Sequence, residues 1–188
     1  MKIAFVSLMR SAPWGGSEEL WSKTALYALT QGHTVETLTY NWVPDSPRIA
    51  QLRQAGVATK FYHGDSKALL DRTAVKFGLK SPKSELIPSL DADIFVISNG
   101  SIWDFVSFKI ITDKIIALGK PYILLIHNTL ESGHNLSEAE RGYAMSVIEK
   151  ATKRLFVSER NREGTERQLA ATVSDYQVAG NPVSIHSP

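Results

Sequence analysis

The amino-acid sequence predicts an α/β domain of the Rossmann-like, doubly wound type, with a mostly parallel sheet and helices on both of its faces. Short apolar runs such as residues 2–8 and 121–127 alternate along the chain with longer segments of helical periodicity. Runs that are apolar on both sides are typical of strands buried between two helix layers. Strands that alternate with helices form βαβ units with right-handed crossovers. At 188 residues, the chain has the length of one such domain.

The first third of the chain contains three predicted strands and two predicted helices. In order, these are the strand Lys2–Leu8, a helix that begins at Ser17, the strand Thr34–Tyr40, the helix Arg48–Ala55 and the strand Ala58–His63. Serine is a residue that caps helix N-termini, so Ser17 is the expected cap of the first helix. Gly32 and Gly56 are placed to end the two helices.

The segment Ser66–Leu90 is less regular, because Gly78, Pro82 and Pro88 divide it into short helices or loops. Basic residues follow one another there at helical spacing: Lys67, Arg72, Lys76, Lys80 and Lys83. A basic face of this kind can contact anionic lipid headgroups at a membrane surface. A solvated surface is the simpler interpretation, since few strongly apolar residues oppose the basic ones.

The remainder of the chain continues the alternation of strands and helices. It is predicted to contain the strand Asp93–Ser98, the helix Asp104–Leu118, the strand Pro121–His127, the helix Ser137–Thr152, the strand Arg154–Ser158, the helix Glu159–Ala171 and the short strand Gln177–Ala179. Gly119 is placed to end the first of these helices. The run from Pro121 to His127 is the clearest interior strand.

Composition limits the classes of protein to which the chain can belong. The 21 Lys and Arg residues and 19 Asp and Glu residues leave a net charge of +2, too balanced to predict nucleic-acid binding. The absence of cysteine excludes disulfides and thiol chemistry, and it suits a reducing compartment. The opening apolar run Ile3–Leu8 is too short to cross a bilayer or to act as a signal peptide. We expect a cytoplasmic protein, with peripheral contact to a membrane left open.

The turn after the first strand is the most informative candidate site. In open α/β sheets, ligands bind at the carboxyl ends of the strands. Gly15 and Gly16 lie there immediately before Ser17 and Glu18, and a glycine turn at a helix N-terminus can hold an anion. The dinucleotide and P-loop fingerprints are both absent. A plain turn, with Glu18 and Glu19 complementing the helix dipole, is an equally good interpretation.

A second candidate site follows the strand that ends at His127. A histidine at a strand end can bind a ligand hydroxyl or transfer a proton, although such residues are often satisfied by the backbone instead. Asn128 and Glu131 follow it, and Asn99 ends a neighbouring predicted strand. A metal site built from His127, Glu131 and His134 is disfavoured, because that spacing requires a helix where a loop is expected.

Six short motifs resemble, in order, those of the retaining family-4 glycosyltransferases of the GT-B type. They are the opening residues Met1–Ser7, the Gly-Gly-x-Glu turn at Gly15–Glu18, the Gly-His-x-Val sequence at Gly32–Val35, Ile126–Asn128, Phe156–Ser158, and the Asn-Pro/Gly-Val entry at Gly180–Val183. The similarity spans the whole chain, but Ala58–Leu90 matches no motif of that family.

The resemblance implies that residues 1–180 form the acceptor-side domain and that residues 181–188 begin a linker to a second domain that binds the nucleotide sugar. The isolated domain would then be inactive. His127 would lie near the transferred sugar as the candidate catalytic residue. Gly15, Gly16, Ser17 and Glu18 would approach the donor phosphates or the acceptor, and the acceptor would contact four further residues: Trp14, Asn99, Asn128 and Glu131. The resemblance implies no metal and no cofactor, because the nucleotide sugar is a substrate and basic groups stabilise its leaving diphosphate.

Two other classes of function compete with this expectation. A free-standing module could bind a phosphorylated ligand at the Gly15–Gly16 turn without catalysis. A nicotinamide-dependent oxidoreductase is disfavoured, because the glycine fingerprint is missing and the second strand ends in Thr39, Tyr40 and Asn41 instead of an acidic ribose contact. The expected partners are a sugar or glycolipid acceptor and a nucleotide sugar.

Overall fold

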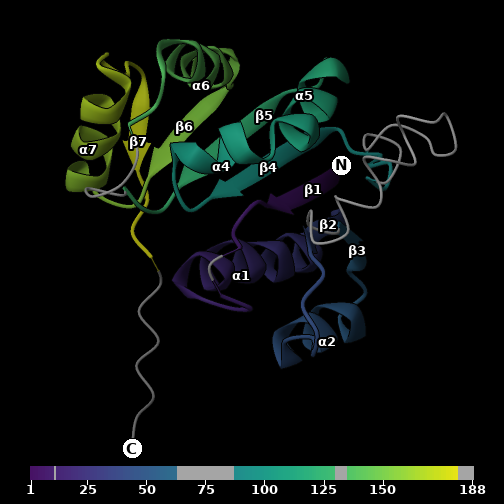
Figure 1. Cartoon of the computed structure of the whole chain (residues 1–188). Coiled ribbons are helices and arrows are strands. Elements are labelled where there is room, and N and C mark those ends of the chain that lie inside the picture. The colour runs from purple at the N-terminus through teal and green to yellow at the C-terminus, as the bar shows by residue number, and fades with distance from the viewer. Residues whose placement is uncertain (11, 63–86, 130–134, 182–188) are drawn as a thin grey trace, which may run out of the picture.

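The computed structural model describes residues 1–10, 12–62, 87–129 and 135–181. In this part of the chain, seven strands form one open sheet in the order β3-β2-β1-β4-β5-β6-β7, and every neighbouring pair is parallel (Figure 1). The strands are β1 (Lys2–Ser7), β2 (Thr34–Tyr40), β3 (Ala58–Tyr62), β4 (Ile94–Asn99), β5 (Tyr122–Ile126), β6 (Lys153–Phe156) and β7 (Tyr176–Val178). The doubly wound α/β class predicted from the sequence is confirmed.

The order of the strands places the reversal of the sheet between β1 and β4. The chain runs outward from β1 through β2 to β3, and then returns to add β4 on the other side of β1. Ile3 pairs with Val35 of β2 on one side and with Ile94 of β4 on the other. In a doubly wound sheet, the loops at such a reversal diverge to opposite faces and leave a crevice for ligands. The carboxyl ends of β1 and β4 are therefore the place to look for a site.

Helices cover both faces of the sheet (Figure 1). They are α1 (Gly16–Thr30), α2 (Pro47–Gln54), α4 (Ile102–Ser107), α5 (Lys109–Ala117), α6 (Glu138–Lys150) and α7 (Glu159–Leu169). Successive side chains of β1 point to opposite faces. Phe5 packs in the core under α1 and α2, where its ring lies 6.2 Å from the buried Trp21 ring, whereas Val6 packs in the core under α4, α5 and α6.

Several predicted helix boundaries are confirmed by their turn geometry. Gly32 and Gly119 have positive φ angles of 77° and 64°, in the region that glycine adopts without steric cost. Ser46 and Ser137 act as side-chain caps for α2 and α6, and Glu140 completes a capping box with Ser137.

Two local predictions were wrong. Gly15, not Ser17, is the N-terminal cap of α1, and the Ser17 hydroxyl bonds to the Glu18 carboxylate instead. The predicted helix Asp104–Leu118 is two helices that meet at Phe108, whose φ of −111° and ψ of 33° are not helical. The Phe108 ring packs 5.4 Å from that of Tyr62, so a tertiary contact accompanies the break. Residues 63–86, which include the basic residues from Lys67 to Lys83, lie outside the described part of the chain.

The packing of α7 against Thr129 can be tested at Gly164. A β-carbon added there would lie 2.6 Å from Thr129 Cγ2, which is too close for any real contact. Gly164→Ala should therefore destabilise the fold by about 1–3 kcal/mol, measured by urea unfolding. Gly142→Ala on α6 is the matched control, because nothing lies within 4 Å of its added β-carbon, and it should be neutral or stabilising. Equal effects of the two substitutions would contradict this packing.

Candidate functional site

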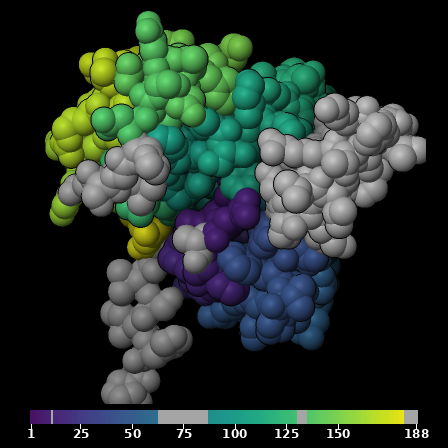
Figure 2. All heavy atoms as spheres, in the orientation of Figure 1, coloured from purple at the N-terminus to yellow at the C-terminus, as the bar shows by residue number. Residues whose placement is uncertain are grey.

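Backbone hydrogen bonds hold the ends of β1, β4 and β5 together. Leu8 N–H donates to Ser98 O at 2.9 Å, His127 N–H to Asn99 O at 3.0 Å, and Asn128 N–H to Gly100 O at 2.5 Å. Figure 2 shows that the first part of the chain (purple) reaches the surface between the β2–α2 part (blue) and the β4–α5 part (teal). The turns after these three strands therefore form one continuous edge.

The turn at Gly15 and Gly16 is folded around the Glu18 side chain. Glu18 is only 5% exposed, and its carboxylate accepts hydrogen bonds from Ser7 Oγ at 3.0 Å and Ser17 Oγ at 2.6 Å. Burial raises the pKa of Glu18, and the two hydroxyls and the Gly15 N–H counter part of that rise. A carboxylate thus lies where a bound anion would sit at the start of α1, which disfavours a second anion there.

Met9 fills the space between the two turns that meet at the reversal. A β-carbon at Gly100 would lie 3.1 Å from Met9 Sδ, and one at Gly15 would lie 3.5 Å from Met9 Cε. The Ser17 Oγ also lies 3.3 Å from Met9 Sδ. The missing side chain at Gly100 therefore allows the turn after β4 to approach the turn after β1.

His127 is held at the same edge by a serine of the neighbouring strand. Its Nε2 lies 3.1 Å from Ser98 Oγ. Burial lowers the pKa of His127 to about 4, and the Asn181 side chain acts in the opposite direction. The imidazole is therefore neutral at pH 7 and acts as a hydrogen-bonding group instead of a cation.

Asn181 connects the far end of the described chain to both candidate sites. Its side chain is close enough to His127 to influence the pKa of the imidazole, and its Nδ2 lies 3.9 Å from the position of a β-carbon on Gly16. The Gly-Gly turn, the strand-end histidine and the asparagine thus meet at one place, although 165 positions separate Gly16 from Asn181.

A second carboxylate, the partly buried Asp104, interacts electrostatically with Glu18. Asp104 accepts hydrogen bonds from Gly100 N–H at 2.6 Å and Ser101 N–H at 3.2 Å, which complete the N-terminus of α4. Burial raises the pKa of Asp104 to about 6, the two backbone donors oppose that rise, and the charge of Glu18 adds to it. The edge therefore holds carboxyl groups that protonate more readily than exposed ones.

The other predicted site residues differ in burial, and two of the residues considered lie outside the described part of the chain. Asn99 is fully buried, with its Nδ2 donating to Ile97 O at 3.3 Å, because strand alternation turns it away from the face that carries Ser98 and His127. Asn128 is exposed at the edge. Glu131 and His134 lie outside the described residues, and no cluster of metal-ligating side chains occurs within 1–10, 12–62, 87–129 and 135–181.

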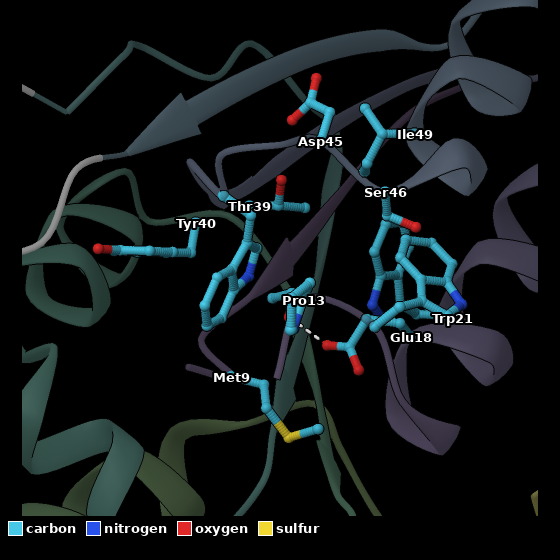
Figure 3. A pocket seen from close by; sticks show the side chains of 12 residues that line it. Met9, Pro13, Glu18, Trp21, Thr39, Tyr40, Asp45, Ser46 and Ile49 are labelled. Atoms are coloured by element: carbon cyan, nitrogen blue, oxygen red, sulfur yellow. Dashed lines mark hydrogen bonds between the residues drawn. The ribbon is translucent and has the colours of Figure 1, made fainter. Parts of the chain in front are cut away.

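Trp14 belongs to a narrow pocket on the β2 side of the Gly-Gly turn (Figure 3). The pocket is lined by Ser7, Met9, Pro13, Trp14, Glu18, Trp21, Thr39, Tyr40, Trp42, Asp45, Ser46 and Ile49. Trp14 Nε1 donates to Glu19 Oε1 at 2.9 Å, and its ring lies 5.9 Å from that of Trp21. Trp103, by contrast, packs against the core under α4.

Sequence reasoning assigned no site role to Ser7, Thr39 or Ser98, and it interpreted Ser98 as part of a plain turn. Each is a hydroxyl residue at or next to the last position of its strand, and all three are buried. In-register pairing puts Ser7 of β1 beside Ser98 of β4. A search for hydroxyl residues at the ends of apolar runs would have found this set.

Comparison with known proteins places the chain among Rossmann-like α/β structures. No protein-family model and no curated protein matches the sequence. In structure, the chain is similar to HepE (Alr3699) of Anabaena, solved in complex with UDP (13% identity, TM-score 0.55) and in complex with UDP-glucose (14% identity, TM-score 0.55). In both comparisons the alignment covers 97% of this chain and 44% of HepE.

HepE has also been solved with UDP and glucose, where the identity is 15%, the TM-score 0.54, and the coverage 97% of this chain and 45% of HepE. At such low identity the likeness establishes the fold. The chain spans less than half the length of HepE. None of the helices in the described part of the chain has the length and apolar composition needed to cross a bilayer.

The depressed pKa of His127 predicts how stability changes with pH. The unfolded imidazole titrates near 6.5 and the folded one near 4, so the unfolded chain binds the extra proton between these values. This contribution to stability is complete above pH 6.5 and is lost as pH falls toward 4. In urea unfolding at several pH values, the free energy of unfolding of His127→Asn relative to that of the wild type should rise by up to about 3 kcal/mol from pH 7 to pH 4.

As a control, the same pH series is measured on His33→Asn, at the other end of α1, and the gain of His127→Asn is compared with it. If His127→Asn ran parallel to the wild type from pH 7 to pH 4, the imidazole would not be held neutral by burial.

Proposed function

We propose that this chain is the acceptor-side half of a nucleotide-sugar-dependent glycosyltransferase of the GT-B type, and that it is inactive without a second, donor-binding domain. The observation that carries the proposal is the meeting of Gly16, His127 and Asn181 at the reversal of the sheet. These residues come from three of the motifs that resemble the family-4 enzymes. They gather where ligands bind in open α/β sheets.

The likeness to HepE supports the same proposal from a different direction. HepE binds UDP and UDP-glucose, and its fold is shared by nearly the whole of this chain. A nucleotide sugar is therefore the proposed donor. The remaining length of HepE corresponds in size to a further domain, as the proposal requires. Retention of anomeric configuration is part of the proposal and follows from the resemblance in sequence.

The proposed reaction joins an acceptor hydroxyl oxygen to the anomeric carbon of the sugar while the bond from that carbon to the diphosphate oxygen breaks, and the hydroxyl proton passes to the departing diphosphate. His127, neutral at pH 7, is proposed to hydrogen-bond a hydroxyl of the transferred sugar and thereby to fix the position of its anomeric carbon. Ser98 Oγ orients the imidazole, and Asn181 borders the other side. Gly16, where only Asn181 lies within 4 Å of an added β-carbon, leaves room for the substrate at the mouth of the crevice.

The proposed function is tested by measuring turnover of the protein expressed from the full native reading frame that contains this sequence. His127→Ala should reduce the rate of UDP release from UDP-glucose in the presence of acceptor sugars by about tenfold or more, because an oriented hydrogen bond in the transition state is lost. His33→Ala is the matched control and should leave the rate unchanged, since His33 lies at the amino-terminal end of β2. The anomeric configuration of the product, read by NMR, tests retention.

Unchanged turnover in His127→Ala would remove the proposed role of His127. Absence of turnover in the native reading frame, with UDP-glucose and with other nucleotide sugars alike, would overturn the proposed function.

A further inference from the structure

The narrow pocket beside the Gly-Gly turn carries an inference about the acceptor, and this inference rests on the proposed function. The pocket lies between α1, the end of β2 and the segment that leads into α2 (Figure 3). Its cavity volume of about 20 Å³ is enough for one water-sized group. A hydroxyl group fits this interior, whereas a phosphate or a whole sugar ring does not.

The interior of the pocket offers hydrogen bonds that the described residues do not use. Thr39 is 7% exposed, and its Oγ1 has no hydrogen-bond partner in the described part of the chain. Glu18 lines the same cavity, where its carboxylate accepts hydrogen bonds from the Ser7 and Ser17 hydroxyls and also interacts with the Gly15 and Glu18 backbone N–H groups. A buried hydroxyl without a partner is costly, and it lies here in a pocket that also holds a strong acceptor. One ligand hydroxyl could bond to both groups.

The mouth of the pocket presents aromatic surface. Trp14 and Trp42 line it, and both are partly exposed. Each of these rings packs against another aromatic ring: the Trp14 ring lies 5.9 Å from the Trp21 ring, and the Trp42 ring lies 5.0 Å from the Tyr40 ring. Indole rings held in this way provide rigid apolar surface next to polar groups.

Charge at the pocket selects against anionic ligands. Its charged lining residues are Glu18 and Asp45, and the lining contains no lysine or arginine within the described ranges. Arg48 Nε lies 3.2 Å from Glu19 and Arg53 lies 3.2 Å from Asp45, whereas the Arg10 guanidinium carbon lies 5.1 Å from the ring centroid of the lining residue Tyr40. A sugar phosphate or an acidic sugar would meet a carboxylate without a compensating cation in the pocket.

From these observations we propose that the pocket is an acceptor subsite that binds one hydroxyl group of an uncharged saccharide, with the sugar ring lying across the Trp14 and Trp42 side chains at the mouth. The inserted hydroxyl donates a hydrogen bond to the Glu18 carboxylate and accepts one from the Thr39 hydroxyl. The acceptor class is therefore a neutral sugar, not a sugar phosphate. The Gly-Gly turn thus separates this subsite from the His127 site.

Titration with the methyl glycosides of neutral hexoses, followed by saturation-transfer NMR and tryptophan fluorescence, tests the subsite. At least one glycoside should bind, and its 6-phosphate should not. Thr39→Val keeps the shape of the side chain and should weaken binding about five- to tenfold, and Glu18→Gln should weaken it further, since a charged acceptor is lost. Thr37→Val is the matched control, because Thr37 is equally buried on the same face of β2 but does not line the pocket.

A deoxy series identifies the inserted hydroxyl without relying on a single variant. The monodeoxy glycoside that lacks this group should bind the wild type more weakly than the parent sugar binds Thr39→Val, because it loses the bonds to both Glu18 and Thr39, and Thr39→Val should not weaken its binding further. The subsite is overturned if no neutral glycoside binds the wild type, if the 6-phosphate binds as well as the parent, or if Thr37→Val weakens binding as much as Thr39→Val. Turnover that depends on His127 would still support the proposed function in each of those cases.

Discussion

The parallel pairing of β1 with β4 is the constraint on which the rest of the site depends. It sets Ser7 directly beside Ser98, so that the turns after two strands distant in sequence leave the sheet at the same height. Each serine then anchors a different group: Ser7 bonds the Glu18 carboxylate, and Ser98 lies against the His127 imidazole. A slip of one residue in this register would turn one of the two hydroxyls to the opposite face and separate the two groups.

The glycine turn before α1 differs in its electrostatics from an ordinary anion site. A helix N-terminus offers free N–H groups and partial positive charge, which usually attract a ligand phosphate. Here the chain supplies its own carboxylate, and burial keeps that carboxylate in place. The same glycines that give the turn the appearance of a phosphate loop therefore serve close packing, as Met9 demonstrates by filling the space between Gly15 and Gly100.

The fold could be predicted from the sequence because its signals are local. Apolar runs, serine caps and glycine stops identified every described strand and nearly every helix within one or two residues. The site could be predicted only in part: His127 was recognisable as a strand-end residue, but its contact with Ser98 depends on register, and its proximity to Asn181 depends on the full path of the chain. The break at Phe108 accompanies a contact with Tyr62, which no local pattern encodes.

Folding also changes the protonation of two side chains at this edge of the sheet, His127 and Asp104. In weakly acidic water the unfolded chain carries its proton on the imidazole of His127 and leaves the Asp104 carboxyl ionised, whereas the folded chain does the reverse. Between pH 4 and 6 the two transfers cancel, so folding discharges both groups with no net uptake from solvent. Between these pH values the edge of the sheet thus loses a cation and an anion together when the chain folds.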